Sequence, residues 1–336
     1  MSNDAAISVG QQFWSGSSGK WAGEMLLKAM ESGGQMSPAA LRTLSTLRKD
    51  EWKAFDEALI EEATIRLVGV ADLIGAGLVK TVANGLGKTV FEYERVSDMD
   101  AATVSLDGTS MGESDRVTFS IDTMPLPITH KDFFINLRTL MASRERGEPL
   151  DTTQVRLAGR LVAESIESQL FTGGNVYGGK TIYGYTTHTD RNTASFGAGT
   201  WSASARTGAE VLTDVLTMLS AAETDRMYGP YWLYVSRNMS TKFSEDFKAN
   251  SDKTIMQRIM QVSGIQAVRV ADQLTADNVV LVQATPDVVT LVEGEPLQTV
   301  QWDVQGGFHI NFKAFTIQVP LIRSDKAGRS GIVHMS

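Results

Sequence analysis

The chain has 336 residues, of which 42% are hydrophobic and 21% charged, as is ordinary for a folded protein of one large domain or two or three smaller ones. Its net charge of -8 argues against a surface that grips nucleic acid through phosphates. The chain has no cysteine, which excludes disulfides, thiol nucleophiles and thiolate metal sites. No apolar run approaches the ~20 residues that span a bilayer, and no secretory signal pattern is present, so we expect synthesis in the cytoplasm without a membrane partner.

Residues 1–37 are rich in Gly and Ser but carry large apolar side chains, including Trp14 and Trp21. Such a segment is too polar to form a core alone and too aromatic for a simple linker. It is either a disordered tail, as chain termini often are, or an arm that docks on another surface. The aromatic side chains favour the arm.

A helix is predicted from about Arg48 to Leu67, because Trp52, Phe55 and Leu59 recur at helical spacing. Its opposite face is charged, and we interpret that face as solvated rather than catalytic, since an exposed helix face does not hold carboxylates in a cleft.

The triplet Gly87-Lys88-Thr89 resembles the end of a phosphate-binding loop. The motif needs a glycine where this chain has Val82, so the spacing argues against nucleotide binding.

Between Val90 and Ile121 apolar and polar residues alternate in two runs, around Tyr93 and around Phe119, which predicts two strands. Asp107-Gly108 between them is a strong turn signal. A hairpin this long is marginal alone in water and is expected to lie on another surface, such as that of another subunit. Its many acidic residues also fit simple protection of exposed strand edges.

A long helix is predicted from Asp151 to Gly173-Gly174, with an apolar stripe that includes Val162 and Ile166. Asp151 and Gln154 have the spacing of a capping box, and the glycine pair ends the helix. At ~1.5 Å per residue the helix is about 30 Å long, so we name it the spine.

Residues 173–204 are dense in Gly, Thr, Ser and Tyr and predict a long loop or short hairpins. His188-Thr189-Asp190 within this stretch could suggest a metal-ligand pair. The chain has only 4 histidines and no local pattern of further ligands, so an ordinary loop histidine is the better interpretation.

A second compact region mixes helices and strands without strict βα alternation, which indicates an α+β fold. Within it we predict a helix around residues 209–219, a buried strand from Tyr231 to Val235, a short helix from Met239 to Phe247 and a turn at Glu293-Gly294-Glu295-Pro296.

Further strands, from Val300 to Met335, are candidates to cover the spine. The chain has no Gly-x-Ser-x-Gly elbow or other catalytic spacing, so we predict no catalytic residue, cofactor or metal.

The order of these parts, together with Pro127-Ile128-Thr129-His130-Lys131-Asp132-Phe133, Ala142-Ser143-Arg144-Glu145-Arg146-Gly147 and Gly229-Pro230-Tyr231-Trp232-Leu233-Tyr234-Val235, resembles encapsulins and the related major capsid proteins of tailed bacteriophages. The resemblance covers roughly residues 45–336 and rests on several weak motifs in register. It implies the Hong Kong 97 fold.

On this chain, the resemblance implies a division into five parts. These are an N-terminal arm (1–46), a helix and connector (47–87), an extended hairpin loop (88–126), a peripheral domain with the spine (127–174 and 296–336) and an axial domain (175–295).

The resemblance also implies a function. The chain is expected to self-assemble through pentamers and hexamers into an icosahedral shell, as a virion capsid made in the cytoplasm of a bacterial host. The shell would enclose double-stranded DNA without sequence-specific binding and work with a portal and separate scaffolding or decoration proteins.

We expect the acidic hairpin to meet basic groups of a neighbouring subunit, mainly for specificity, since exposed ion pairs contribute only about 0.2–1 kcal/mol each. The residues expected at subunit contacts are Trp14, Trp21, Asp98, Asp100, Asp107, Gly108, Glu113, Arg138, Arg144, Arg146, Arg323, Lys326 and Arg329.

Two alternatives stay open. An encapsulin nanocompartment would have the same shell but hold a cargo enzyme, while a soluble enzyme would stay monomeric at high concentration. The long N-terminal arm and the long loop after residue 173 favour the phage coat.

Overall fold

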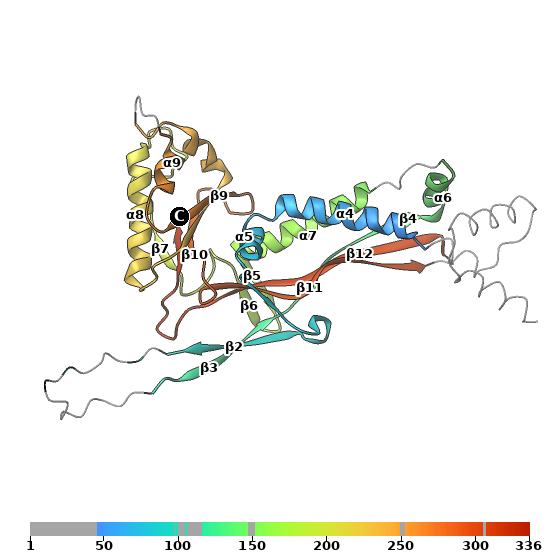
Figure 1. Ribbon diagram of the computed structural model, residues 1–336, viewed down its shortest axis with the longest axis horizontal. Helices are drawn as coiled ribbons and strands as arrows, with labels where there is room; N and C mark the ends of the chain where they lie inside the picture. Colours follow the sequence, from blue (N-terminus) through green and yellow to red (C-terminus); the bar gives the residue numbers. More distant parts are fainter. Residues whose placement is uncertain are drawn as a thin grey trace, which may run out of the picture. The chain divides into compact units, whose positions relative to one another are not determined.

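The structure is a computed structural model that describes residues 46–97, 99, 104, 106, 116–146, 152–248, 253–304 and 307–336. Its helices and strands are mixed (Figure 1), as the predicted α+β class requires. The helical elements are α4 (Lys49–Arg66), α5 (Gly69–Gly75), η1 (Gly85–Gly87), α6 (Leu137–Arg146), α7 (Thr153–Phe171), α8 (Gly208–Thr224), η2 (Arg237–Ser244) and α9 (Ile255–Met260), where η denotes a 3-10 helix.

The strands form two larger sheets and two separate hairpins. They are β1 (Val79–Thr81), β2 (Val90–Val96), β3 (Phe119–Pro125), β4 (Thr129–Asn136), β5 (Gly173–Tyr177), β6 (Lys180–Tyr183), β7 (Asn192–Ala194), β8 (Tyr231–Ser236), β9 (Ile265–Ala271), β10 (Val279–Gln283), β11 (Val289–Val304), β12 (His309–Ile322) and β13 (Ile332–Met335).

The chain divides into two compact units, and the smaller one includes the described residues 46–51, 134–146, 301–304 and 307–311. Inside it, Arg144 of α6 pairs with Glu51, with 2.7 Å between Nη2 and Oε2. Leu137 donates its backbone N–H to the carbonyl of Phe308 at 3.0 Å. The larger unit contains the spine, both separate hairpins and the five-stranded sheet.

The spine is confirmed as α7, and its predicted apolar stripe is buried, with Val162 and Ile166 each 1% exposed. The predicted cap is wrong, because Thr152 flanks the helix as its N-cap residue and makes no side-chain capping hydrogen bond. Asp151 itself lies outside the described residues. Gly159 lets α4 approach closely, since a Cβ there would lie 2.9 Å from a methyl group of Leu59.

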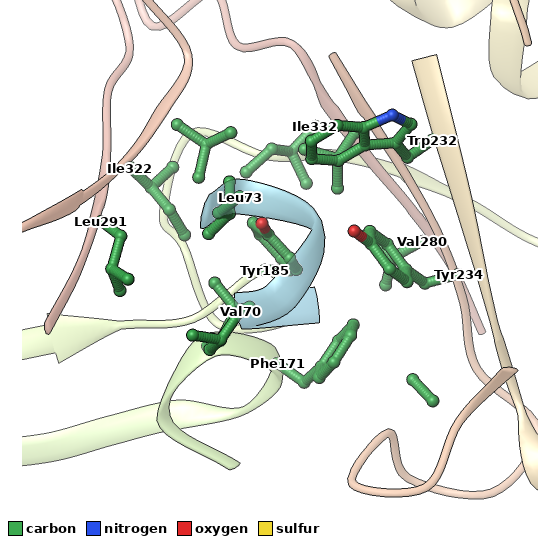
Figure 2. Close-up of a cluster of buried hydrophobic side chains, with 14 of the residues drawn as sticks. Val70, Leu73, Phe171, Tyr185, Trp232, Tyr234, Val280, Leu291, Ile322 and Ile332 are labelled. Atoms are coloured by element: carbon green, nitrogen blue, oxygen red, sulfur yellow. The ribbon is translucent and has the colours of Figure 1, made fainter. Parts of the chain in front are cut away.

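One core of the larger unit joins α5, the end of α7 and the sheet strands β8 and β10 (Figure 2). Phe171, Tyr185 and Tyr234 pack edge-to-face or stacked, with ring centroids 5.1 to 6.1 Å apart. Val70 and Leu73 of α5 close the cluster and are fully buried. Because burying each such side chain contributes about 1.5–3 kcal/mol, this cluster fixes α5 between the spine and the sheet.

The five-stranded sheet has the order β7-β13-β10-β8-β9, and α8 and α9 pack against it through a second buried cluster. Strands β8 and β10 are buried along their whole length, which confirms the predicted buried strand at 231–235. The C-terminal strand β13 pairs antiparallel with β10, with Val279 opposite Met335. Ile332 at the start of β13 also packs in the same core as Val162 and Ile166 of the spine, and the expected division into domains stays a prediction.

The four-stranded sheet has the order β1-β11-β12-β4. The predicted turn at Glu293–Pro296 is wrong, because β11 runs without interruption from Val289 to Val304. Gly294 is needed for close packing rather than for a turn, since a Cβ there would lie 3.0 Å from Ile317 and 3.1 Å from the Cα of Gly85. The Gln318 amide also donates to Glu293 Oε1 at 2.9 Å, so Gln318 on β12 and Glu293 on β11 are neighbours in the sheet.

We predict that Gly85→Ala destabilises the protein by about 1–3 kcal/mol, because a Cβ at Gly85 would lie 2.4 Å from the Gly294 backbone. Gly75→Ala is the matched control, since a Cβ there meets nothing within 4 Å. Denaturant unfolding of both variants tests this. Equal unfolding midpoints would contradict the tight approach of η1 to β11.

We predict that Asp214→Ala costs about 3–5 kcal/mol of unfolding free energy. Asp214 of α8 is buried, pairs with Arg206 and accepts from the indole N–H of Trp201 at 2.8 Å. Removing it leaves the guanidinium buried without its carboxylate.

Asp272→Ala is the control for Asp214→Ala, since the exposed Asp272–Arg237 pair is worth at most about 1 kcal/mol. Unfolding followed by tryptophan fluorescence measures both. A loss no larger in Asp214→Ala than in the control would refute the structural role of this pair.

Candidate functional site

The candidate site is the base of the β2–β3 hairpin. The two strands pair antiparallel from Val90 opposite Pro125 to Val96 opposite Phe119, which confirms the predicted hairpin and extends its second strand to Pro125. The expected contact residues of the tip lie outside the described residues, namely Asp98, Asp100, Asp107, Gly108 and Glu113.

The hairpin has an inner and an outer face because its side chains alternate. Phe91 and Tyr93 point inward and pack on a cluster that includes Ile182 of β6 and Leu321 of β12. The outer face carries Val96, Phe119 and Ile121, which are 44%, 64% and 67% exposed. In the described part of a single chain, this outer face thus exposes an apolar patch of Val96, Phe119 and Ile121 beside the acidic side chains of Glu92 and Glu94.

Arg95 anchors the inner face. Its Nη2 atom donates to Asp190 Oδ2 at 3.0 Å, to Ser324 Oγ at 2.8 Å and to the Asp325 carbonyl at 2.7 Å. Its Nη1 atom lies 3.7 Å from Asp122 across the hairpin. One guanidinium thus holds together β2, β3, the loop before β7 and the loop after β12. Hydrogen bonds from a charged donor are stronger than hydrogen bonds between two neutral groups.

The loop after β12 adds a second attachment. Lys326 donates from Nζ to Thr118 Oγ1 at 2.9 Å and from its backbone to the carbonyl of Val96 at 3.4 Å. Arg329 pairs with Asp325 inside the loop at 3.7 Å, and Arg323 donates its backbone N–H to Val288. This predicted basic cluster therefore supports the base of the hairpin of its own chain.

His188 lies in the wall of this site and is buried beside the ring of Tyr183. Its Nδ1 atom accepts the backbone N–H of Asp190 at 3.2 Å, and burial lowers the pKa of its imidazole. Although burial raises the pKa of the Asp190 carboxyl, hydrogen bonding from Ser324 and the nearby charges of His188 and Arg95 hold that pKa below its usual value.

A cavity of about 290 Å³ lies among these residues, lined by Arg95, Asp122, His188 and Asp190. Its charged groups already pair with one another, as the contacts of Arg95 show. The pairing of Arg95 with Asp122 and Asp190 stabilises a joint between these segments.

The other expected contact residues lie in α6 of the smaller unit. Arg138 and Arg146 are exposed, whereas Arg144 donates to Glu51 and to the carbonyl of Thr46 at 2.9 Å. Trp14 and Trp21 lie outside the described residues. The expected contacts between subunits stay predictions.

Sequence reasoning missed Arg95 and Asp190. The signal was visible in part, because Phe91, Tyr93 and Arg95 share one face of a strand with period two. Its partners at 190, 324 and 325 come from distant loops, which no local pattern connects.

Among the described residues, no group of three or more His, Cys, Asp or Glu is placed to hold a metal ion. In the same part of the chain, every helix is too short or too polar to cross a membrane.

We predict that Arg95→Ala loosens the hairpin base by about 1–3 kcal/mol, because three hydrogen-bond acceptors and the Asp122 carboxylate, from three separate segments, lose their common partner. Faster amide exchange in β2 and β3, with little change in β8 and β10, is the expected result. Lys53→Ala is the control, since Lys53 makes only an exposed pair with Glu57 on α4. Equal exchange in the two variants would argue against the anchor.

The chain is similar in sequence to known proteins. A profile of a family of unknown function, DUF6260, matches residues 40–335. The type 1 encapsulin shell protein EncA of Myxococcus xanthus is 24% identical over 238 residues, which are 69% of this chain and 71% of that protein.

Solved structures are similar as well. The virus-like particle of Pyrococcus furiosus matches with a TM-score of 0.62 at 16% identity, over 85% of this chain and 99% of that one. The capsid of Myoviridae phage XM1 matches with a TM-score of 0.57 at 10% identity, over 77% and 89%. The predicted α+β fold of the Hong Kong 97 type is thus confirmed.

Proposed function

Because this chain belongs to the family of unknown function DUF6260 and has the Hong Kong 97 fold, we propose that it is a major capsid protein. It self-assembles through pentamers and hexamers into an icosahedral shell that encloses phage DNA. The chain acts as a structural protein of the virion, is made in the host cytoplasm and has no catalytic role.

The observation that carries this proposal is the outer face of the β2–β3 hairpin. Val96, Phe119 and Ile121 are exposed there although the inner face of the same hairpin is firmly anchored. Isolated hairpins are marginal in water, and exposed apolar faces mark interaction surfaces. A neighbouring copy in a shell supplies the missing cover.

The geometry also suits repeated assembly. The hairpin base is fixed by Arg95 and Lys326, so the apolar face is presented in one orientation. Contacts of one patch with a different patch on the next copy close into rings or shells, and stable subunit contacts commonly bury about 2,000–5,000 Å². Segments that extend from the folded core, such as the β2–β3 hairpin, supply such contact area without a larger core.

The charges fit a container better than a nucleic-acid-binding protein. A net charge of -8 argues against a surface that grips phosphates, and the proposed shell encloses double-stranded DNA without sequence-specific contacts. A portal and separate scaffolding or decoration proteins complete the proposed assembly.

The second candidate is an encapsulin nanocompartment, which the similarity to EncA favours. The two functions differ in the contents of the particle. Purified particles that contain nuclease-protected DNA support the coat, whereas a co-purifying cargo enzyme without DNA supports the compartment.

We predict that Phe119→Asp combined with Ile121→Asp abolishes shell formation, because two buried charges at a subunit contact cost several kcal/mol per copy. Phe119→Leu with Ile121→Val keeps the face apolar and is expected to assemble. Electron microscopy and sedimentation of the purified proteins measure this, with circular dichroism as a check of folding. A folded double aspartate variant that still forms shells would exclude this face from the contact.

A further inference from the structure

Two helices, α8 and α9, cover one buried cluster of the five-stranded sheet, and each leaves a face in solvent. The helix α8 packs on β7 and β13 at one edge of the sheet, whereas α9 packs on β9 at the other edge and also touches α8. Since neighbouring strands lie about 4.8 Å apart, the two edges of the sheet are separated by roughly 20 Å. All these elements lie in the larger unit, where α8 and β9 are on opposite sides of the sheet (Figure 1).

The middle of the exposed face of α8 is uncharged. Leu216 is 47% exposed there, and its exposed neighbours on the helix are Thr213, Thr217 and Ser220. Thr213 and Thr217 each donate their hydroxyl to the carbonyl four residues earlier, at 2.9 and 3.0 Å. Both threonine donors are therefore satisfied within the helix, so an apolar partner can cover this surface without leaving them unpaired.

The charges at the two ends of this face are negative. No Lys or Arg occurs in residues 207–225, while Glu210 and Glu223 lie in the first and last turns of α8. Asp214 is buried and adds nothing to the surface. Arg226, in the turn after the helix, ends this negative stretch. We name the exposed side chains of residues 207–225 the α8 face.

The opposite flank of the sheet carries the reverse charge. Residues 253–271, which span α9 and β9, include no Asp or Glu but three cations, Lys253, Arg258 and Arg269. Arg258 is exposed, and the side chain of Arg269 stays 52% exposed although it lies 3.4 Å from Asp72. We name the exposed side chains of residues 253–271 the α9 face.

The acidic residues that border the α9 face are already paired. Glu245 lies 2.6 Å from Lys242, and Asp272 lies 2.7 Å from Arg237. These carboxylates have cations of their own, so they do not neutralise Arg258. The α9 face therefore stays positive.

The centre of the α9 face is apolar, as it is on α8. Met256 and Met260 stand about one turn apart on α9 and are 42% and 40% exposed. Methionine side chains are flexible and adapt to the shape of an apolar partner. The two flanks of one body thus offer matching apolar centres within charges of opposite sign.

We propose that the α8 face of one copy binds the α9 face of the next copy, head to tail, so that successive copies close into a ring. This contact rests on the shell function proposed above and names the surfaces through which its pentamers and hexamers form.

The physical reason is that two different patches on one body make a contact that repeats from copy to copy and closes when the rotation fits. Opposite charges at the rim set the orientation, while the apolar centres supply the buried core of the contact. Two α8 faces would instead bring like charges together, which disfavours a two-fold contact through α8.

Because the chain has no cysteine, single engineered cysteines report this contact without background. Full-length Leu216→Cys and Met260→Cys are co-expressed, purified and treated with a bismaleimide that has a flexible spacer. We expect cross-linked dimers from the co-expressed pair and none from either variant alone, because equal faces do not meet. Thr217→Cys with Met256→Cys is a second pair, which decides if a variant of the first pair does not fold.

Charge exchange tests the complementarity in the same assay. Glu223→Lys or Arg258→Glu, placed in both cysteine variants, is expected to slow cross-linking roughly 3- to 10-fold at low salt, because attraction at an exposed contact becomes repulsion. The two exchanges combined are expected to restore the rate. Glu57→Lys is the matched control, since Glu57 is an exposed carboxylate on α4 and is expected to leave the rate unchanged.

Three results overturn the proposal: dimers from Leu216→Cys alone, no dimers from either cysteine pair, or rates that the charge exchanges leave unchanged. Electron microscopy of the same samples separates this contact from the proposed function. Shells that form without cross-links exclude the contact and keep the shell, whereas cross-linked rings that never form shells support the contact and contradict the shell.

Discussion

A two-stranded ribbon has two faces, and in the described part of the chain only one face of the β2–β3 hairpin is covered. Its inner face is packed on β6 and β12 and held by the guanidinium of Arg95. Its outer face keeps Phe119 and Ile121 in solvent. The proposed assembly depends on this imbalance, since the anchor fixes the direction of a surface that needs a partner.

The anchor also changes how the basic residues near the C-terminus are understood. Lys326 and Arg329 looked like partners for the acidic hairpin of a neighbouring copy. In the structure they stabilise the loop that supports the hairpin of their own chain. Charge in this region therefore positions the hairpin first, and any contact with a neighbour is additional.

Buried polar groups connect the elements of the larger unit. Asp214 holds Arg206 and Trp201 against α8, and Glu167 holds α5 against α7. Each removes a carboxylate from water, which is costly unless several donors surround it. Asp214 is paired with the guanidinium of Arg206, whereas Glu167 accepts three backbone N–H groups, and burial raises the pKa of the Glu167 carboxyl.

Local patterns in the sequence determined the spine, the α4 helix, the two hairpin strands and the buried strand β8. The spacing of apolar residues along a short stretch of chain is enough to distinguish a helix from a strand there. They also determined the α+β class. The same local patterns failed at Gly294, where a Gly-Glu-Pro run looked like a turn but lies inside a strand, since the glycine is needed for contact with Gly85.

Tertiary structure alone decided the pairing of β13 with β10 and the partners of Arg95 and Glu167. Those contacts join residues that are far apart in the chain, with 95 positions between Arg95 and Asp190 and 98 between Gly69 and Glu167. A single sequence shows which side chains are available for such contacts, but only the packed chain shows which of them meet.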